Sequence, residues 1–108
     1  MRLLLERKRR EADDNERARR EILVALRAAL VRLAPGTVLW VYGSVTRPGG
    51  FGSYSDVDIA FESLPPGRSL YAMQSLLSAA CGRELDVCFL DESRLAGKIM
   101  REGERWTV

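Results

Sequence analysis

The sequence contains no histidine and only two cysteines. Without histidine it lacks the general base of Ser-His and Cys-His nucleophile systems, and it cannot supply the usual Cys/His ligand sets of zinc sites. No apolar run approaches the roughly 20 residues that a membrane span needs, and the start, MRLLLERKRR, is too short in apolar residues for a signal peptide. We therefore expect no membrane segment, a cytoplasmic location, and a chemistry that depends on carboxylates, hydroxyls and a metal ion.

The chain also has little net charge, +2 over 108 residues, too small to favour nucleic acid or an anionic membrane as the main partner. The charge is uneven, because residues 1–20 carry eight Arg and Lys against five Asp and Glu. We interpret residues 1–19 as a charged N-terminal helical extension and residues 20–108 as a single domain. The basic run at residues 7–10 is typical of a solvated helix, with contact to RNA or to an acidic partner surface as the alternative.

Apolar spacing and turn residues predict the order of elements. A long helix over 1–34 ends at Pro35-Gly36, with Asp13-Asp14-Asn15 as a place where it breaks or a new helix is capped. Strands are predicted over 37–42, 56–61 and 84–90, the first of them buried on both faces. Helices are predicted over 69–81 and from Asp91 to about Met100, with an edge strand at 106–108. The expected fold class is α+β (α/β-type), a small mixed β-sheet flanked by helices and preceded by a long N-terminal helix.

Three aspartates point to metal chemistry. Asp56 and Asp58 alternate with apolar residues on one strand, so both side chains lie on the same face, about 6 to 7 Å apart along the strand. Asp86 occupies the matching face of a later strand. If the strands pair, three carboxylates converge, and a divalent cation with oxygen ligands relieves their repulsion. Two such ions activate a hydroxyl and stabilise a leaving phosphate.

Gly43-Ser44 follows the first strand directly. Glycine lets the backbone approach a ligand closely, and the amides of the next turn, with the serine hydroxyl, form an anion site. A phosphate site beside a carboxylate cluster is what phosphoryl or nucleotidyl transfer requires.

These residues resemble the GS…DxD signature of the polymerase-β-like nucleotidyltransferase superfamily. The chain is similar to its minimal, single-domain branch over residues 20–108, including the ending Arg101-Glu102-Gly103 followed by Trp106. The resemblance implies a polymerase-β-like nucleotidyltransferase core. Eleven residues separate Gly-Ser from the first aspartate instead of the family's usual ten, and the flexible loop between them can absorb the difference.

The resemblance also implies a role for each site residue. Gly43 and Ser44 would hold the nucleotide phosphates, and Arg47 stands where many members carry a basic residue. Asp56, Asp58 and Asp86 would bind Mg²⁺, two ions in all, with Asp86 activating the acceptor hydroxyl.

The same resemblance suggests a partner and a reaction. Minimal members are commonly antitoxins that silence a helical HEPN ribonuclease toxin by transferring AMP from ATP to one of its tyrosines. Two alternatives remain. One is a non-catalytic antitoxin or binding module that neutralises its partner by contact, and the other is a nucleotidyltransferase that acts on a small molecule.

Overall fold

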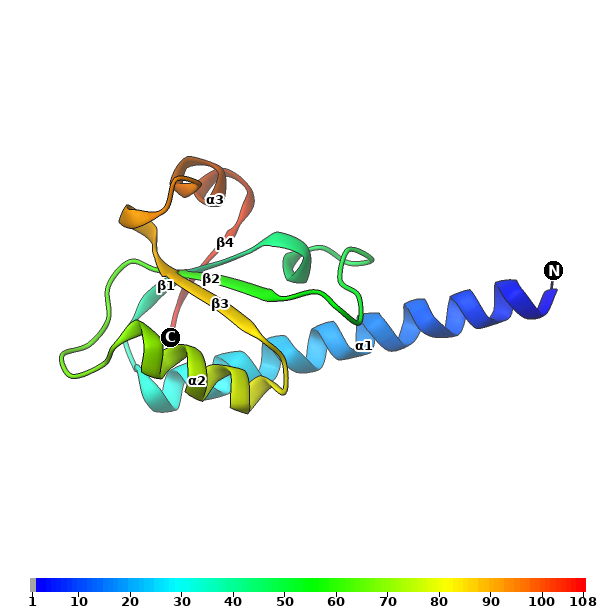
Figure 1. The fold of residues 1–108 in the computed structure, drawn as a ribbon, viewed down its shortest axis with the longest axis horizontal. Coiled ribbons are helices and arrows are strands. Elements are labelled where there is room, and N and C mark those ends of the chain that lie inside the picture. Colours follow the sequence, from blue (N-terminus) through cyan, green and yellow to red (C-terminus); the bar gives the residue numbers. More distant parts are fainter. Residues whose placement is uncertain (1) are drawn as a thin grey trace.

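Helix α1 dominates the outline of the molecule (Figure 1). The structure, a computed structural model, describes residues 2–108, and α1 runs without interruption over Arg2–Leu33. Asp13-Asp14-Asn15 therefore neither break nor cap a helix. Residues 2–14 are all exposed and project from the body, whereas Ile22, Leu26, Ala29 and Leu30 are buried. The second half of α1 packs on the domain, and the first half is a free-standing arm.

A four-stranded mixed sheet forms the centre. Its strands are β1 (Val38–Tyr42), β2 (Val57–Phe61), β3 (Leu85–Phe89) and β4 (Glu104–Thr107). They lie in the order β3-β2-β1-β4, with β1 antiparallel to both of its neighbours and β2 parallel to β3. The predicted α+β class and mixed sheet are confirmed, and the strand expected at 106–108 begins two residues earlier.

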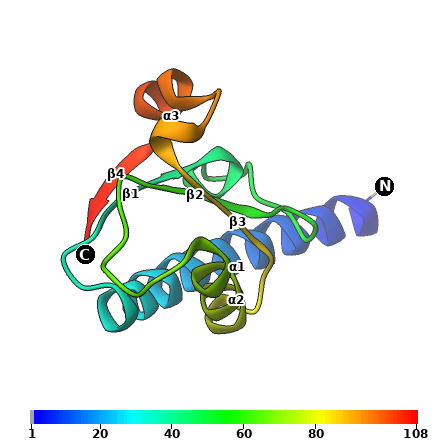
Figure 2. The same cartoon turned by 60° about the vertical axis from the view of Figure 1, so that its left-hand side comes forward.

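The two faces of the sheet are covered differently (Figures 1 and 2). Helices α1 and α2 (Leu70–Cys81) lie on one face, and α3 (Ala96–Glu102) lies on the other. The prediction that the first strand is buried on both faces is wrong. Leu39 and Val41 are buried toward α1 and α2, but Trp40 and Tyr42 are only partly covered, because the second face carries only the short helix α3.

Local sequence explains where α2 begins and ends. The hydroxyl of Ser69 accepts a hydrogen bond from the Ala72 amide at its start, and Gly82 adopts left-handed backbone angles at its end. The last helix was expected from Asp91, but a 3₁₀ turn (Leu90–Glu92) comes first and α3 starts at Ala96. Within residues 2–108, no helix is both long and apolar enough to cross a lipid bilayer.

The glycine-rich loop between β1 and β2 is held in place by two side chains. Phe51 is buried, with 4% of its surface exposed. The guanidinium of Arg83, just before β3, lies 4.6 Å from the Phe51 ring centroid and donates hydrogen bonds to the carbonyls of Gly52 and Ser55, each at 2.9 Å. The eleven residues between Gly43-Ser44 and Asp56 therefore include a loop with a defined path.

Candidate functional site

The site begins where β1 ends in a tight turn. Gly43 has a φ of +79°, a conformation that side chains other than glycine's rarely adopt, and it starts a 3₁₀ helix over Gly43–Thr46. The hydroxyl of Thr46 donates to the Gly43 carbonyl at 2.7 Å. From α1, the Arg19 guanidinium donates to the Val45 carbonyl at 3.0 Å. The turn is thus fixed both internally and from the long helix.

Gly43 lies directly against Asp58. The antiparallel register of β1 and β2 pairs Tyr42 with Asp58, which puts the next residue of β1 beside that carboxylate. A Cβ atom added to Gly43 would lie 2.6 Å from Asp58 Oδ2, closer than real Cβ atoms come to an oxygen. Gly43 and Asp58, which belong to separate predicted motifs, are therefore in contact, and only glycine fits at position 43.

Asp58 and Asp86 occupy matching positions on neighbouring strands. The parallel register pairs Asp58 with Asp86, and residues paired in this way have side chains on the same face, with strands about 4.8 Å apart. The parallel pairing of these two strands, on which the predicted convergence depends, is confirmed. Asp56 is exposed and lies just before β2, two residues from Asp58.

The pKa of Asp58 shows that partly burying this carboxylate close to the others disfavours its ionised form. Partial burial, together with the negative charges of Asp86 and then Asp56, raises the pKa of Asp58 from 3.8 to about 6. Among residues 2–108, the ion pairs involve Glu16 and Glu62, and none includes Asp58. A half-buried carboxylate beside another carboxylate, with no ion-pair partner, is a position where a cation is favoured.

These carboxylates suit a hard cation by their chemistry, because oxygen ligands are what Mg²⁺ prefers. Asp58 and Asp86 would hold it, with Asp56 as a further carboxylate whose charge already acts on Asp58. Over residues 2–108, however, no group of three or more Asp, Glu, Cys or His side chains is placed so that it could hold a metal ion. The three-aspartate metal site stays a prediction.

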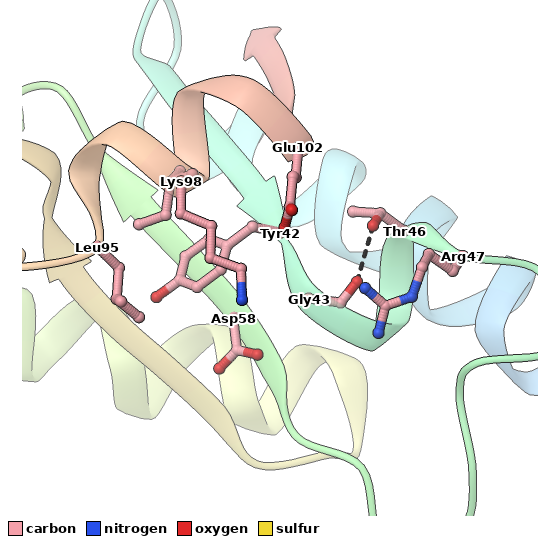
Figure 3. A pocket seen from close by; sticks show the side chains of 9 residues that line it. Tyr42, Gly43, Thr46, Arg47, Asp58, Leu95, Lys98 and Glu102 are labelled. Carbon is pink, nitrogen blue, oxygen red and sulfur yellow. Dashed lines mark hydrogen bonds between the residues drawn. The ribbon is translucent and has the colours of Figure 1, made fainter.

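A cavity of about 600 Å³ opens above Asp58, between the Gly43 turn and α3 (Figure 3). Its lining residues are Tyr42, Gly43, Thr46, Arg47, Asp58, Leu95, Lys98, Ile99 and Glu102. The predicted residues Gly43, Arg47 and Asp58 all line it. Ser44, Asp56 and Asp86 are not among its lining residues, although Ser44 is in the same turn and Asp86 is the strand neighbour of Asp58.

The cavity contains groups that the motifs do not mark. Tyr42 stands over Asp58, and burial raises the pKa of its phenol, with the nearby Cys88 as a smaller cause. The Tyr42 hydroxyl and the Cys88 sulfur lie 3.9 Å apart. Lys98 and Glu102 come from α3. The sequence offers one sign that Tyr42 belongs to the site, its position directly before Gly43. It offers no such sign for Lys98.

Comparisons of the chain with protein-family models, with curated proteins and with solved structures return no match.

The raised pKa of Asp58 predicts a pH dependence of stability without metal. Because the folded-state pKa lies above the unfolded value, Asp58 stabilises the fold while protonated, and this contribution is lost as the pH rises through about 6. Urea unfolding in EDTA, followed from pH 4 to 7.5, should show this loss in wild type but not in Asp58→Asn. Mg²⁺ should raise the stability of wild type most above pH 6. Equal pH slopes for the two proteins would contradict the assignment.

Proposed function

We propose that this protein is a Mg²⁺-dependent nucleotidyltransferase that transfers a nucleoside monophosphate, AMP from ATP, to a hydroxyl group of a partner protein. The observation that carries the proposal is the contact between Gly43 and Asp58, with Asp86 paired beside Asp58. A backbone turn suited to phosphate thus lies against two convergent carboxylates, at the edge of a cavity large enough for a nucleotide. This juxtaposition supports the resemblance of the sequence to polymerase-β-like nucleotidyltransferases.

The residues divide the reaction between them. The Gly43-Ser44 turn and Arg47 bind the phosphates, using backbone amides, a hydroxyl and a guanidinium. Asp58 and Asp86, with Asp56, would hold the metal ion, which would polarise the phosphate and lower the pKa of the acceptor hydroxyl. Asp86 accepts the acceptor's proton. The acceptor oxygen bonds to the α-phosphorus, the bond from that phosphorus to the β-phosphate oxygen breaks, and pyrophosphate leaves with the electron pair.

The acceptor is proposed to be a tyrosine of a HEPN-type helical toxin, with this protein as its cytoplasmic antitoxin. The arm of α1 supports a partner that docks there, because residues 2–14 are all exposed and project from the rest of the described chain. Leu3, Leu4 and Leu5 are 53–76% exposed there. Isolated helical segments of this length are marginal in water, so a partner that covers the arm would stabilise it.

A second candidate function is neutralisation of the toxin by contact alone. The same exposed arm favours it, because binding through α1 requires no chemistry at the cavity. A small-molecule acceptor is the third reading, and no feature of the cavity favours it over a protein hydroxyl.

Transfer of a radiolabel tests the proposed function. The protein is incubated with Mg²⁺, ATP labelled at the α-phosphate and a candidate toxin, and labelled protein is resolved by electrophoresis and mass spectrometry. We expect an added AMP on a toxin tyrosine and loss of toxin ribonuclease activity. ATP labelled at the γ-phosphate is the control and should leave no label. Neutralisation of the toxin without any label would contradict transfer and favour contact.

A further inference from the structure

The wall of the cavity opposite the Gly43 turn is formed by α3. Ile99 anchors this helix with 2% of its surface exposed, and the residue before it, Lys98, is exposed to the cavity. Figure 3 shows the Lys98 side chain descending from α3, with its amine directed toward the space above the Asp58 carboxylate. A cation on a flexible stem therefore extends over the carboxylate where reaction is proposed.

Lys98 is not committed to another group in the described chain. The ion pairs over residues 2–108 involve Glu16 and Glu62, and neither Lys98 nor Arg47 takes part in one. These two cations line the cavity from different walls, Lys98 from α3 and Arg47 from the end of the Gly43 turn. The cavity also contains the carboxylates of Asp58 and Glu102. None of these four charged groups is joined to another in an ion pair of residues 2–108.

Lysine is rare in this chain, so its presence at the cavity is informative. Lys8 and Lys98 are its only lysines among 17 basic residues. A lysine ammonium is a compact, strongly hydrated charge with three rotatable donors, suited to following a phosphate group that moves. Arginine offers a rigid planar fork instead. A lysine at position 98 therefore suits a phosphate group that moves during the reaction.

We propose that Lys98 binds the β- and γ-phosphates of the nucleoside triphosphate and stabilises them as they leave as pyrophosphate. The inference rests on the proposed function, which puts the α-phosphate at the carboxylates. The remaining phosphates must then lie in the rest of the cavity, where Lys98 and Arg47 are the cations. As the bond from the α-phosphorus breaks, negative charge grows on the leaving oxygens. The ammonium stabilises this charge by donating hydrogen bonds and keeps its own proton.

Nucleotide binding separates this role from a structural one. Calorimetry would compare α,β-methylene-ATP, which cannot release pyrophosphate, with AMP, which lacks the outer phosphates, both in Mg²⁺. For Lys98→Gln we expect triphosphate binding to weaken about 10- to 100-fold, the usual effect of losing one charged hydrogen bond. AMP binding should stay within about twofold of wild type. Lys98→Arg should restore part of the triphosphate affinity.

Lys8→Gln is the matched control, because it removes the same charge from the exposed arm of α1. It should bind both nucleotides like wild type. Circular dichroism would check that each variant is folded. The inference is overturned if Lys98→Gln binds the triphosphate as wild type does, or if it loses triphosphate and AMP affinity equally.

Chemical protection provides an independent readout on the wild-type protein. An N-hydroxysuccinimide ester acylates exposed lysines, and mass spectrometry reads the two sites separately. Mg²⁺ with α,β-methylene-ATP should protect Lys98 but not Lys8, and AMP should protect neither. Equal acylation of Lys98 with and without the triphosphate would refute the inference.

The outcomes also separate this inference from the proposed function. If the wild type binds the triphosphate through Lys98 but labels no acceptor, only the transferase assignment fails. If the wild type transfers AMP and Lys98→Gln does so equally well, only the role of Lys98 fails. If the wild type binds no triphosphate at all, both fail.

Discussion

Replacing Asp58 with asparagine is expected to reduce AMP transfer at least about a thousandfold while leaving the fold as stable as wild type or more so. The loss of activity follows from its place, because Asp58 is the carboxylate that contacts the turn proposed to bind phosphate and pairs with Asp86. An amide has nearly the same shape but cannot carry the negative charge that holds a divalent cation. Reaction should therefore fail without any change in structure.

The gain in stability follows from the pKa. Near neutral pH the folded protein must hold Asp58 ionised although its pKa is about 6, above the ordinary value of 3.8. That cost disappears with an uncharged amide. Since Asp58 is only half-buried, solvent screening reduces the gain to about 1 kcal/mol at pH 7.

The measurements are α-phosphate label transfer and urea unfolding in EDTA at pH 7. Asp91→Asn is the control, because Asp91 is an exposed carboxylate in the turn after β3 and is not a lining residue of the cavity. It should leave transfer unchanged. If Asp58→Asn neutralises a toxin as well as wild type does, catalysis is not the means of neutralisation. A large drop in its stability would contradict the electrostatic account.

Substitution of Gly43 by alanine is expected to damage both activity and stability. Two penalties act together. Alanine is strained at a φ of +79°, and its Cβ would lie 2.6 Å from Asp58 Oδ2. The backbone strain costs about 1 kcal/mol, and the steric overlap, which rotation of the Asp58 side chain partly relieves, raises the total to about 2 kcal/mol. Because the overlap displaces the Asp58 carboxylate, transfer should fall at least about a hundredfold.

Gly49 provides a close control. It has the same φ of +79°, but a Cβ added there meets nothing within 4 Å. Gly49→Ala should therefore show the backbone penalty alone, about 1 kcal/mol, with most of the transfer activity retained.

A double-mutant cycle isolates the contact itself. In an Asp58→Ala background the carboxylate oxygen is gone, so adding Gly43→Ala should cost no more than Gly49→Ala does. The coupling energy, from chemical unfolding of the four proteins, should be at least about 1 kcal/mol. Additive effects of the two substitutions would show that Gly43 and Asp58 are not in contact.

Much of the fold was predictable because its signals are local. Alternation of apolar and acidic residues placed Asp58 on one face of a strand, and Asp86 followed the same rule on another. Turn chemistry at Ser69 and Gly82 marked the ends of α2. Such patterns depend on the 2.0 and 3.6 residue periods, which need no knowledge of the neighbours.

Predictions that depend on how the elements pack against one another were less accurate. An apolar strand sequence such as Val38–Tyr42 looks the same whether one face or both are covered, and here α3 covers only part of the second face. The start of α3 was misplaced because Leu90–Glu92 forms a separate turn. No motif near Lys98 in the chain predicts that it belongs to a site. It reaches the cavity only because α3 packs back over the sheet.

The order of the amino acids alone determined which chemical groups this protein can use: aspartates on alternating strand positions, a glycine-serine turn, and no histidine. The tertiary structure alone decided which of them meet. Gly43 touches Asp58 because β1 and β2 pair in one antiparallel register, and Asp86 faces Asp58 because β2 and β3 pair in one parallel register. Register is a long-range property, since shifting either strand by one residue would turn these carboxylates to the opposite face without changing a single local signal.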